Sequence, residues 1–540
     1  MATVFMKWLE RRPQDYDRGI QLLTLGKLGS LQAQIVHHLI FEETRVLEIG
    51  CGTGELTLIM AQAGAEVTAI DISPPMLAEA ERKVDQAGLA DRVEFKVLDA
   101  ALVGDHFDGG SFELIVSSLT FSEMTTQVRA YVLKTCLTLL AQGGRLAILD
   151  EVLPEKLAAR LFYSAVRIPL RFLTWLLTRT TTHPLRDFTT TLSHAGYTTE
   201  VIASELGGSL QLMIASPGKE PGGMAFPRTV LGRLQHHTSL RTLLIDIWAT
   251  FFRILPPYPK IEPGLYAVGR PDPNSVVLVT GNFDLTVRRL VQAIEGKVSA
   301  WVLVVDSAGI NVWCAAGGGF LNAERVIGAL RVSELEEIVH HRDLILPQLC
   351  ANGVDGWLIR REASWEVHWG PVRAEDLPDY LVAGKDKTDA MRWVRFPLKD
   401  RLEMVTATLG FYGLIILIPV AIFLRELFWP IFISLVGLSY FYAVIHPWLP
   451  GRDGLMKSLP LALIALAGLA TYVLLWEPLP WPRIFNWSLG LIGLSVFTAA
   501  ELQGMSPRMR GEQANWGWEV IIVAALGLTY WLVPQALGWR

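Results

Sequence analysis

The sequence predicts a multidomain α/β protein: two Rossmann-like α/β units followed by an all-α bundle of about five transmembrane helices. Up to about residue 400, apolar strand-like runs alternate with amphipathic helical runs, which is typical of parallel sheets covered by helices. Beyond Leu402 the chain turns into long apolar stretches. A length of 540 residues exceeds one ordinary core, so several domains are expected.

The first predicted unit covers residues 1–216. Its five strand-like runs are TRVLEIGCGTG, AEVTAIDIS, DRVEFKVLDA, FELIVSSLTFS and GGRLAILDEV, and helical runs such as PPMLAEAERKVDQAG lie between them. This alternation predicts a doubly wound parallel sheet. The stretch SPGKEPGGMAFP, rich in Gly and Pro, marks the end of the unit, and residues 217–254 are expected to be a linker.

Glycines and carboxylates stand where three of these strands end. Glycines after the first strand let the backbone approach a ligand at the carboxyl edge of the sheet, where such sheets bind ligands. A carboxylate after the second strand can accept hydrogen bonds from both hydroxyls of a ribose, and one after the third can bind an adenine amino group. The candidate residues are Glu48, Gly50, Gly52, Gly54, Asp71 and Asp99.

The motifs VLEIGCGTG, AIDIS and VLDA resemble those of class I S-adenosylmethionine-dependent methyltransferases, over most of residues 40–150. The resemblance implies that S-adenosylmethionine is the cofactor of this unit. The alternative, a nicotinamide dinucleotide domain, expects the pattern G-x-G-x-x-G, whereas Leu56 and Thr57 stand about where its third glycine would fall. More narrowly, SSLTFSEM and GGRLAILDEVLP resemble methyltransferases that accompany corrinoid proteins. Candidates for the methyl-acceptor side are Ser117, Ser118, Glu123 and His183.

The second unit, residues 255–400, contains the stretch NVWCAAGGG between a very apolar run and a charged helical run. The pattern predicts that Asn311 caps a short helix closed by Gly317, with Cys314 in its first turn. Orphan N–H groups and the helix dipole at that place favour the thiolate, which is a soft metal ligand. The alternative is that Cys314 is a small buried hydrophobe, the commonest fate of a free cysteine.

The same stretch resembles the cap helix of mercury-methylating corrinoid proteins, a membrane-bound family with the signature N-V-W-C-A-A-G. The resemblance covers about residues 255–540 and implies that Cys314 is the lower axial ligand of the corrinoid cobalt. The family commonly has Lys after the signature glycine, where this chain has Gly318, so the contacts of that cation are missing here. The candidate corrinoid contacts are Thr280, Asn282, Asn311, Trp313 and Cys314.

Five apolar stretches after Leu402 are long enough to span a bilayer as helices. Lys and Arg are more frequent in alternate connections, so the positive-inside rule places residues 1–400 in the cytoplasm and the C-terminus outside. We therefore expect a multi-pass protein of the inner (cytoplasmic) membrane, with the lipid bilayer as a partner and the soluble domains in the cytoplasm. The stretches are approximately Met404 to Leu424, Phe428 to Leu449, Leu459 to Trp476, Ile484 to Ala500 and Trp518 to Leu537.

Composition and cysteine pattern limit the other partners. A net charge of -5 without a basic, aromatic-interleaved patch gives no reason to expect nucleic acid. The four cysteines form no C-x-x-C pair, so neither a disulfide framework nor an iron–sulfur cluster is expected. Low-potential electrons would then come from an external ferredoxin-like reductant.

Together the patterns predict a membrane-bound methyltransferase in which S-adenosylmethionine methylates a Cys-ligated corrinoid, which passes the methyl group to a soft metal such as Hg(II). A donating thiolate opposite the methyl group favours its departure as a carbanion equivalent. Two alternatives stay open. The corrinoid could have an external methyl donor or a non-mercury acceptor, while the first unit methylates a separate small molecule. The chain could also be a membrane corrinoid-binding carrier or sensor.

Overall fold

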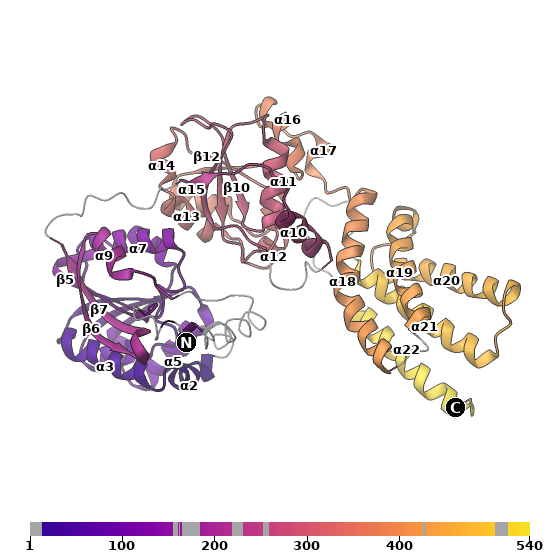
Figure 1. Ribbon diagram of the computed structural model, residues 1–540, viewed down its shortest axis with the longest axis horizontal. Coiled ribbons are helices and arrows are strands. Elements are labelled where there is room, and N and C mark those ends of the chain that lie inside the picture. Colours follow the sequence, from indigo (N-terminus) through magenta and orange to yellow (C-terminus); the bar gives the residue numbers. More distant parts are fainter. Residues whose placement is uncertain are drawn as a thin grey trace.

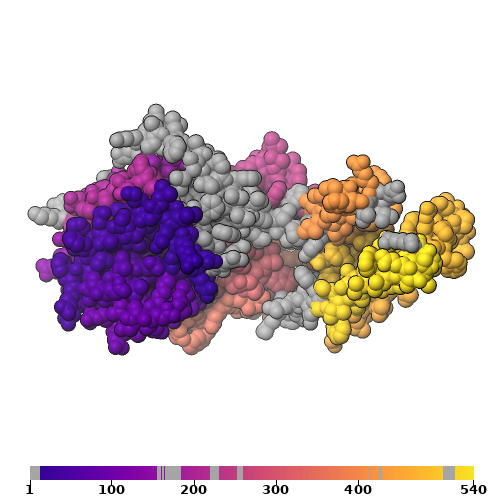
Figure 2. Space-filling model, turned by 90° about the horizontal axis from the view of Figure 1, so that it is seen from below, coloured from indigo at the N-terminus to yellow at the C-terminus, as the bar shows by residue number. Residues whose placement is uncertain are grey.

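A computed structural model of the chain describes residues 13–154, 160, 163–164, 184–218, 230–251, 259–423, 425, 428–502 and 517–539. These residues form two α/β domains and a helical region, with the first domain and the helical region at opposite ends of the molecule (Figure 1). The space-filling view shows the same order (Figure 2).

The first domain is built on a seven-stranded sheet with the order β3-β2-β1-β4-β5-β7-β6. The five strands predicted from the sequence are parallel, and β7 and β6 extend the sheet antiparallel beyond β5. This architecture confirms the predicted class I methyltransferase fold. The strands are β1 (Arg45–Ile49), β2 (Glu66–Asp71), β3 (Val93–Val97), β4 (Phe112–Ser118), β5 (Leu140–Glu151), β6 (Tyr197–Glu205) and β7 (Leu210–Pro217).

Helices cover both faces of this sheet because its central strands β1 and β4 are buried on both sides. One face packs against α3 (Lys27–Leu39) and α4 (Glu55–Gln62), and the other against α7 (Thr126–Leu139) and α9 (Phe188–His194). The remaining helices of this domain are α2 (Pro13–Leu23), α5 (Pro74–Gln86) and α6 (Val103–His106), with the short turns η1 (Ala90–Arg92), η2 (Ala100–Leu102) and η3 (Leu206–Gly208).

The second domain is built on a six-stranded sheet with the order β13-β12-β10-β11-β9-β8. Its central strands β10 and β11 are parallel and nearly fully buried, while β9 runs antiparallel to β11. The edge strand β8 and helix α10 (Leu240–Phe251) lie within the stretch 217–254 that the sequence indicated as a linker. The strands are β8 (Val230–Arg233), β9 (Gly264–Val268), β10 (Val277–Gly281), β11 (Ala300–Val305), β12 (Asp343–Leu346) and β13 (Glu366–Trp369).

Short helices connect these strands, and two of them matter for the site. Helix α12 (Val312–Gly317) follows the carboxyl end of β11, and α13 (Ala323–Val332) returns the chain along the sheet toward β12. The others are α11 (Asp284–Ile294), α14 (Leu335–Ile338), η4 (Gln348–Cys350), α15 (Gly356–Ala363), η5 (Ala374–Asp376), α16 (Leu377–Val382) and α17 (Asp389–Arg392).

The described part of the C-terminal region is helical and strongly apolar. Four helices are long and apolar enough to cross a membrane, and a fifth, which is bent by 43° between its halves, adds to them if it counts as one span. Large apolar side chains such as Ile433 and Leu474 remain exposed, which is consistent with membrane association. The helices are α18 (Leu398–Phe423, the bent one), α19 (Phe428–Ile445), α20 (Leu455–Leu475), α21 (Trp481–Glu501) and α22 (Gly517–Ala536), with the turn η7 (His446–Trp448) after α19.

Candidate functional site

The turn between β1 and α4 holds three glycines in the left-handed region, with φ of 75°, 55° and 75° at Gly50, Gly52 and Gly54. Neighbouring atoms also exclude side chains at two of them. A Cβ would lie 2.2 Å from Thr120 Oγ1 at Gly50 and 2.7 Å from Ala80 Cβ at Gly54. At Gly52 the nearest neighbour of such a Cβ is 3.7 Å away, so the backbone there is open to a ligand.

Asp71 and Asp99 lie at the carboxyl ends of β2 and β3, beside this turn. Asp71 accepts hydrogen bonds from the N–H groups of Gly52 and Ser73, each at 2.9 Å. Asp99 accepts one from the N–H of Ala101 at 2.9 Å and thereby starts η2. Both aspartates are half-buried, so each carboxylate keeps lone pairs for a ligand. The structure thus brings the glycines, Asp71 and Asp99 to one edge of the sheet.

Glu48 lies beneath the same edge and is 1% exposed. Thr57, in α4, donates a hydrogen bond from Oγ1 to Glu48 Oε2 at 2.5 Å. Burial raises the pKa of Glu48 to about 8, and the charge of Asp71 adds to the rise. Glu48 therefore holds a proton at neutral pH and acts on the glycine turn through α4, since solvent does not reach it.

Helix α2 adds contacts that the motifs did not reveal. Thr53, in the glycine turn, donates a hydrogen bond to Asp17 of α2, and Lys83 of α5 forms an ion pair with the same carboxylate. Lys83 also contacts Glu55 at 2.9 Å. Asp17 is 36 residues from Thr53, so no local motif indicates this contact.

The ends of β4 and β5 continue this edge and form the expected methyl-acceptor side. Ser117 is fully buried, and its Oγ has no hydrogen-bond partner among the described residues. Asp150 accepts a hydrogen bond from the N–H of Ser122 at 3.0 Å, and burial raises its pKa to about 6. The other sequence candidates are Ser118 and Glu123, which are half-buried, and His183, which lies outside the described residues.

In the second domain, α12 begins as the sequence predicts. The side chain of Asn311 accepts a hydrogen bond from the N–H of Cys314 at 3.0 Å, which confirms the predicted N-cap. Cys314 is exposed, whereas Cys51, Cys136 and Cys350 are buried. The alternative in which Cys314 is a buried hydrophobe is therefore wrong, and the thiol is open to a ligand.

A cavity of about 130 Å³ lies beside α12 at the carboxyl ends of β10 and β12. Thr280 and Val312 line it together with apolar side chains that include Leu346 and Val372. Sites that enclose a whole small-molecule ligand measure about 300–1,000 Å³. The cavity is therefore too small to enclose a large planar ring.

Asn282 is fully buried, and its amide is used within the protein. Its Oδ1 accepts hydrogen bonds from the N–H of Ser307 at 3.0 Å and the N–H of Gly309 at 2.9 Å, and its Nδ2 donates to Asp306 at 2.9 Å. These bonds join the end of β10 to the loop that leads into α12. Asn282 thus positions the cap helix, while Thr280 lines the cavity.

Trp313 is half-buried, and its ring centroid lies 6.3 Å from that of Phe396, at an interplanar angle of 34°. Phe396 stands two residues before α18. The contact therefore couples the cap helix to the segment that enters the helical region.

The residues at this edge fit a corrinoid better than a bare metal ion. Among the described residues, no group of three or more His, Cys, Asp or Glu side chains could hold a metal. A single exposed thiol suits a metal whose other ligands come from its own macrocycle, because the protein then needs to supply only one donor. At Gly319 a Cβ would meet nothing within 4 Å, so the end of α12 is open at this residue.

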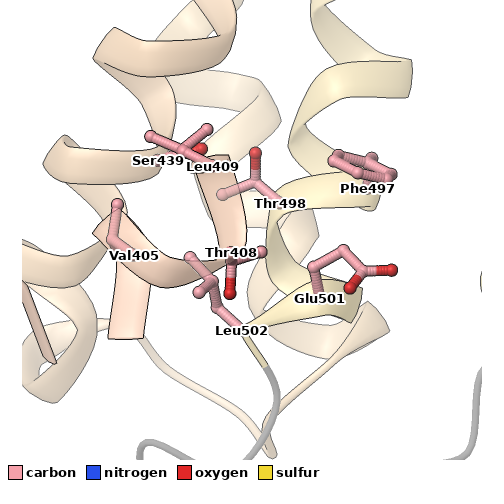
Figure 3. A pocket seen from close by; sticks show the side chains of 8 residues that line it. All are labelled: Val405, Thr408, Leu409, Ser439, Phe497, Thr498, Glu501 and Leu502. Carbon is pink, nitrogen blue, oxygen red and sulfur yellow. The ribbon is translucent and has the colours of Figure 1, made fainter. Parts of the chain in front are cut away.

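A second, much smaller cavity of about 10 Å³ lies between α18, α19 and α21. Hydroxyls of Thr408, Ser439 and Thr498 and the carboxylate of Glu501 are among the groups that line it (Figure 3). This volume corresponds to about one water molecule, so the cavity has no room for a larger ligand.

Two parts of the chain match protein-family models. Residues 46–144 match a methyltransferase domain, and residues 256–381 match the CO dehydrogenase/acetyl-CoA synthase delta subunit. The first match lies on the seven-stranded sheet and the second on the six-stranded sheet.

Individual relatives give the same division. An uncharacterized methyltransferase of Synechocystis sp. is 30% identical over 232 residues, which are 41% of this chain and 99% of that protein. The acetyl-CoA decarbonylase/synthase complex subunit gamma of Methanopyrus kandleri is 36% identical over 123 residues, which are 23% of this chain and 26% of that protein. The chain thus spans about a quarter of the length of this relative. A solved complex of DhpI with SAH is 19% identical, with a TM-score of 0.31, over 41% of this chain and 98% of that one.

Proposed function

The chain belongs to the class I methyltransferases through its first domain, and on this premise we propose that it is a membrane-bound enzyme that carries its methyl acceptor, a corrinoid, on its second domain. S-adenosylmethionine binds at the glycine turn, and the corrinoid binds at the carboxyl edge of the six-stranded sheet. The observation that carries the proposal is the exposed thiol of Cys314, which Asn311 holds in the first turn of α12.

In the first domain the residues act by positioning. Gly52, Asp71 and Asp99 would hold the nucleoside part of the donor at this edge of the sheet. S-adenosylmethionine bound there would supply a methyl cation equivalent, with the electron pair of the broken S–CH₃ bond left on sulfur and the new bond formed by an electron pair of the acceptor. Such a transfer depends mainly on in-line geometry and needs no general base.

In the second domain Cys314 would hold the cobalt through its thiolate, with Asn311, Trp313 and Thr280 around the ring and Asn282 positioning the loop. A bound corrinoid supplies a metal centre that can take up a methyl group and pass it on. A thiolate is a strong donor, which favours release of the methyl group to a soft electrophile. We therefore propose Hg(II) as the acceptor to test first.

Gly318 bears on the choice of acceptor. A Cβ at this position would lie 3.1 Å from Cys314 O and from the ring of Phe320, so a lysine here would have to displace its neighbours. The end of α12 thus carries no cation. Acceptors other than mercury therefore belong in the same assay.

Two further partners belong to the proposal. A cobalt centre must be reduced before it can supply an electron pair to a methyl cation equivalent, and a ferredoxin-like protein is the proposed source of the electrons. The apolar helices α18 to α22 anchor the enzyme in the inner membrane, with the two α/β domains on the cytoplasmic side.

The test uses the full chain in lipid nanodiscs with cobalamin, a low-potential chemical reductant and methyl-labelled S-adenosylmethionine. We expect label in the corrinoid fraction with the wild type and with Asp91→Ala, an exposed control. Asp71→Ala should lose donor binding, and Cys314→Ala should lose the absorbance signature of a thiolate ligand. Normal binding of both ligands without label in the corrinoid would overturn the proposal in favour of a carrier with an external donor.

A further inference from the structure

We infer that the contact between the two α/β domains is a docking surface that sets both ligand-binding edges on the same side, so that methyl transfer takes place within one chain. This inference rests on the proposed function and adds to it a set of positioning residues that contact neither proposed ligand. Helix α13 of the second domain packs against η2 and α7 of the first. Figure 1 shows α13 and α7 where the two domains meet.

The contact is apolar at its centre. One continuous buried core contains Leu98 and Leu102 of the first domain together with Val326, Ile327 and Leu330 of α13. Core packing of this kind resembles the interior of a single domain, and it resists the independent movement that small polar interfaces allow.

Helix α13 approaches η2 closely at Gly328, at the centre of the contact. A Cβ at Gly328 would lie 3.6 Å from the Cβ of Ala101, which is an ordinary van der Waals distance. Ala101 is the second residue after Asp99, so the docking surface begins directly beside the predicted adenine contact. A side chain larger than alanine at Gly328 would push the domains apart.

Two ion pairs flank the apolar centre. Arg331 Nε lies 2.9 Å from Asp105 Oδ2, and Lys134 Nζ lies 2.5 Å from Glu334 Oε1. Partly exposed pairs of this kind add little stability, but they select one register of the two surfaces.

The relative orientation of the two sheets follows from contacts at two places along the interface. Helices α7 and α13 each run from the carboxyl edge of their own sheet toward its amino edge. Near the start of α7, Gln127 lies against Gly264, which pairs with Val304 at the carboxyl end of β11; a Cβ at Gly264 would be 2.5 Å from Gln127 Oε1. Farther along α7, Lys134 meets Glu334, which lies just beyond the end of α13. The two carboxyl edges therefore lie on the same side of the contact.

This arrangement gives the cap helix a reason to be exposed. The glycine turn and Asp99 mark the carboxyl edge of the first sheet, and α12 with Cys314 marks that of the second. An acceptor held at Cys314 is then confined near the donor, which raises its effective concentration and removes the need for an encounter between separate molecules.

The first test compares two variants. Gly328→Phe places a large side chain in the contact, whereas the Cβ of Gly328→Ala fits at 3.6 Å from Ala101 Cβ. Hydrogen–deuterium exchange on the ligand-free full chain should show faster exchange of η2 and α7 in Gly328→Phe only. Single-turnover transfer of label from S-adenosylmethionine to bound cobalamin should slow at least about tenfold in Gly328→Phe and less than about twofold in Gly328→Ala, with both ligand affinities unchanged.

The second test uses the ion pair. Arg331→Glu alone should slow transfer, and the double variant Asp105→Lys with Arg331→Glu should restore it, which loss of folding would not do. The inference would be overturned if Gly328→Phe transferred the methyl group at the wild-type rate despite faster hydrogen–deuterium exchange. It would also be overturned if η2 and α7 exchanged as fast in the wild type as in Gly328→Phe. A wild type that binds both ligands and transfers no label would instead refute the proposed function, while the exchange comparison would still decide whether the domains dock.

Discussion

The backbone nitrogen of Cys314 lies 3.0 Å from the side-chain oxygen of Asn311, and this hydrogen bond starts helix α12. It orders the one exposed cysteine of the chain at the carboxyl edge of the second sheet. A ligand bound through the thiol therefore contacts a donor that is already ordered, which reduces the conformational entropy lost on binding.

Removal of this cap should weaken corrinoid binding. Asn311→Ala loses an N-cap worth about 1 kcal/mol, so we expect a dissociation constant about fivefold higher by absorbance titration. Asn322→Ala is the matched control, because Asn322 caps α13 by the same bond to Arg325 at 3.0 Å but does not support Cys314. An equal loss of affinity in both variants would show that the effect is general destabilisation.

The packing of α12 predicts a second effect. A Cβ at Gly353 would lie 2.0 Å from Ala316 O, so Gly353→Ala must shift the cap helix. Overpacking of this kind costs about 1–3 kcal/mol, and we expect roughly a 5- to 150-fold loss of corrinoid affinity with unchanged binding of S-adenosylmethionine. Gly232→Ala, where a Cβ meets nothing within 4 Å, should bind normally. Unchanged corrinoid affinity in Gly353→Ala would mean that α12 does not hold the ligand.

The stability of the first domain should fall as the pH rises toward 8. The pKa of Glu48 is raised from 4.5 to about 8, so between these values the folded domain binds a proton that the unfolded chain does not. Linkage then lowers the free energy of unfolding by about 1.4 kcal/mol per pH unit. Thermal unfolding at about pH 6 and about pH 8 should show this slope in the wild type and in the exposed control Glu81→Gln, and not in Glu48→Gln.

The chosen pH window avoids a second carboxyl group. The pKa of Asp150 is raised to about 6, so most of its contribution falls at lower pH. Equal pH sensitivity of wild type and Glu48→Gln between about pH 6 and about pH 8 would show that Glu48 is already ionised in the folded domain.

Two glycines of the first domain allow backbone strain to be distinguished from steric collision. Gly54 and Gly88 have φ of 75° and 70°, so alanine at either position carries the strain of the left-handed region, about 1–2 kcal/mol. Only at Gly54 does a Cβ also collide, at 2.7 Å from Ala80 Cβ. Gly54→Ala should therefore lower the unfolding temperature more than Gly88→Ala and also weaken donor binding. Similar losses in the two variants would show that the turn relaxes away from α5.

The number of spans decides where the C-terminus lies. If bent α18 crosses the membrane with α19 to α22, five spans place the C-terminus on the side opposite the α/β domains, whereas four spans place it on the same side. Reporter fusions after residue 539 should be active only outside the cytoplasm, while fusions after residue 384, in the loop between α16 and α17, should be active inside it. Activity of both on one side would show that α18 does not span.

Several parts of the candidate site follow from local sequence. Gly50, Asp71 and Asp99 stand directly after apolar strand runs, and parallel strands bring their carboxyl ends to a common edge. The cap of α12 is equally local, because Asn311 and Cys314 are three residues apart. Glu48 and Asn282 were less well anticipated: both are buried, and their side chains support the turn and the loop from within.

The sequence by itself determined the order of the domains, the strand ends that bear ligand-binding residues, the cap of Cys314 and the apolar helices, because each depends on periodicity or on neighbours within a few residues. Only the tertiary structure decided that Asp17 contacts the glycine turn and that α13 docks on η2 and α7. Contacts such as Arg331 with Asp105 join residues 226 positions apart. Such contacts depend on two surfaces whose shapes and charges become complementary only after folding, so a local sequence pattern does not predict them.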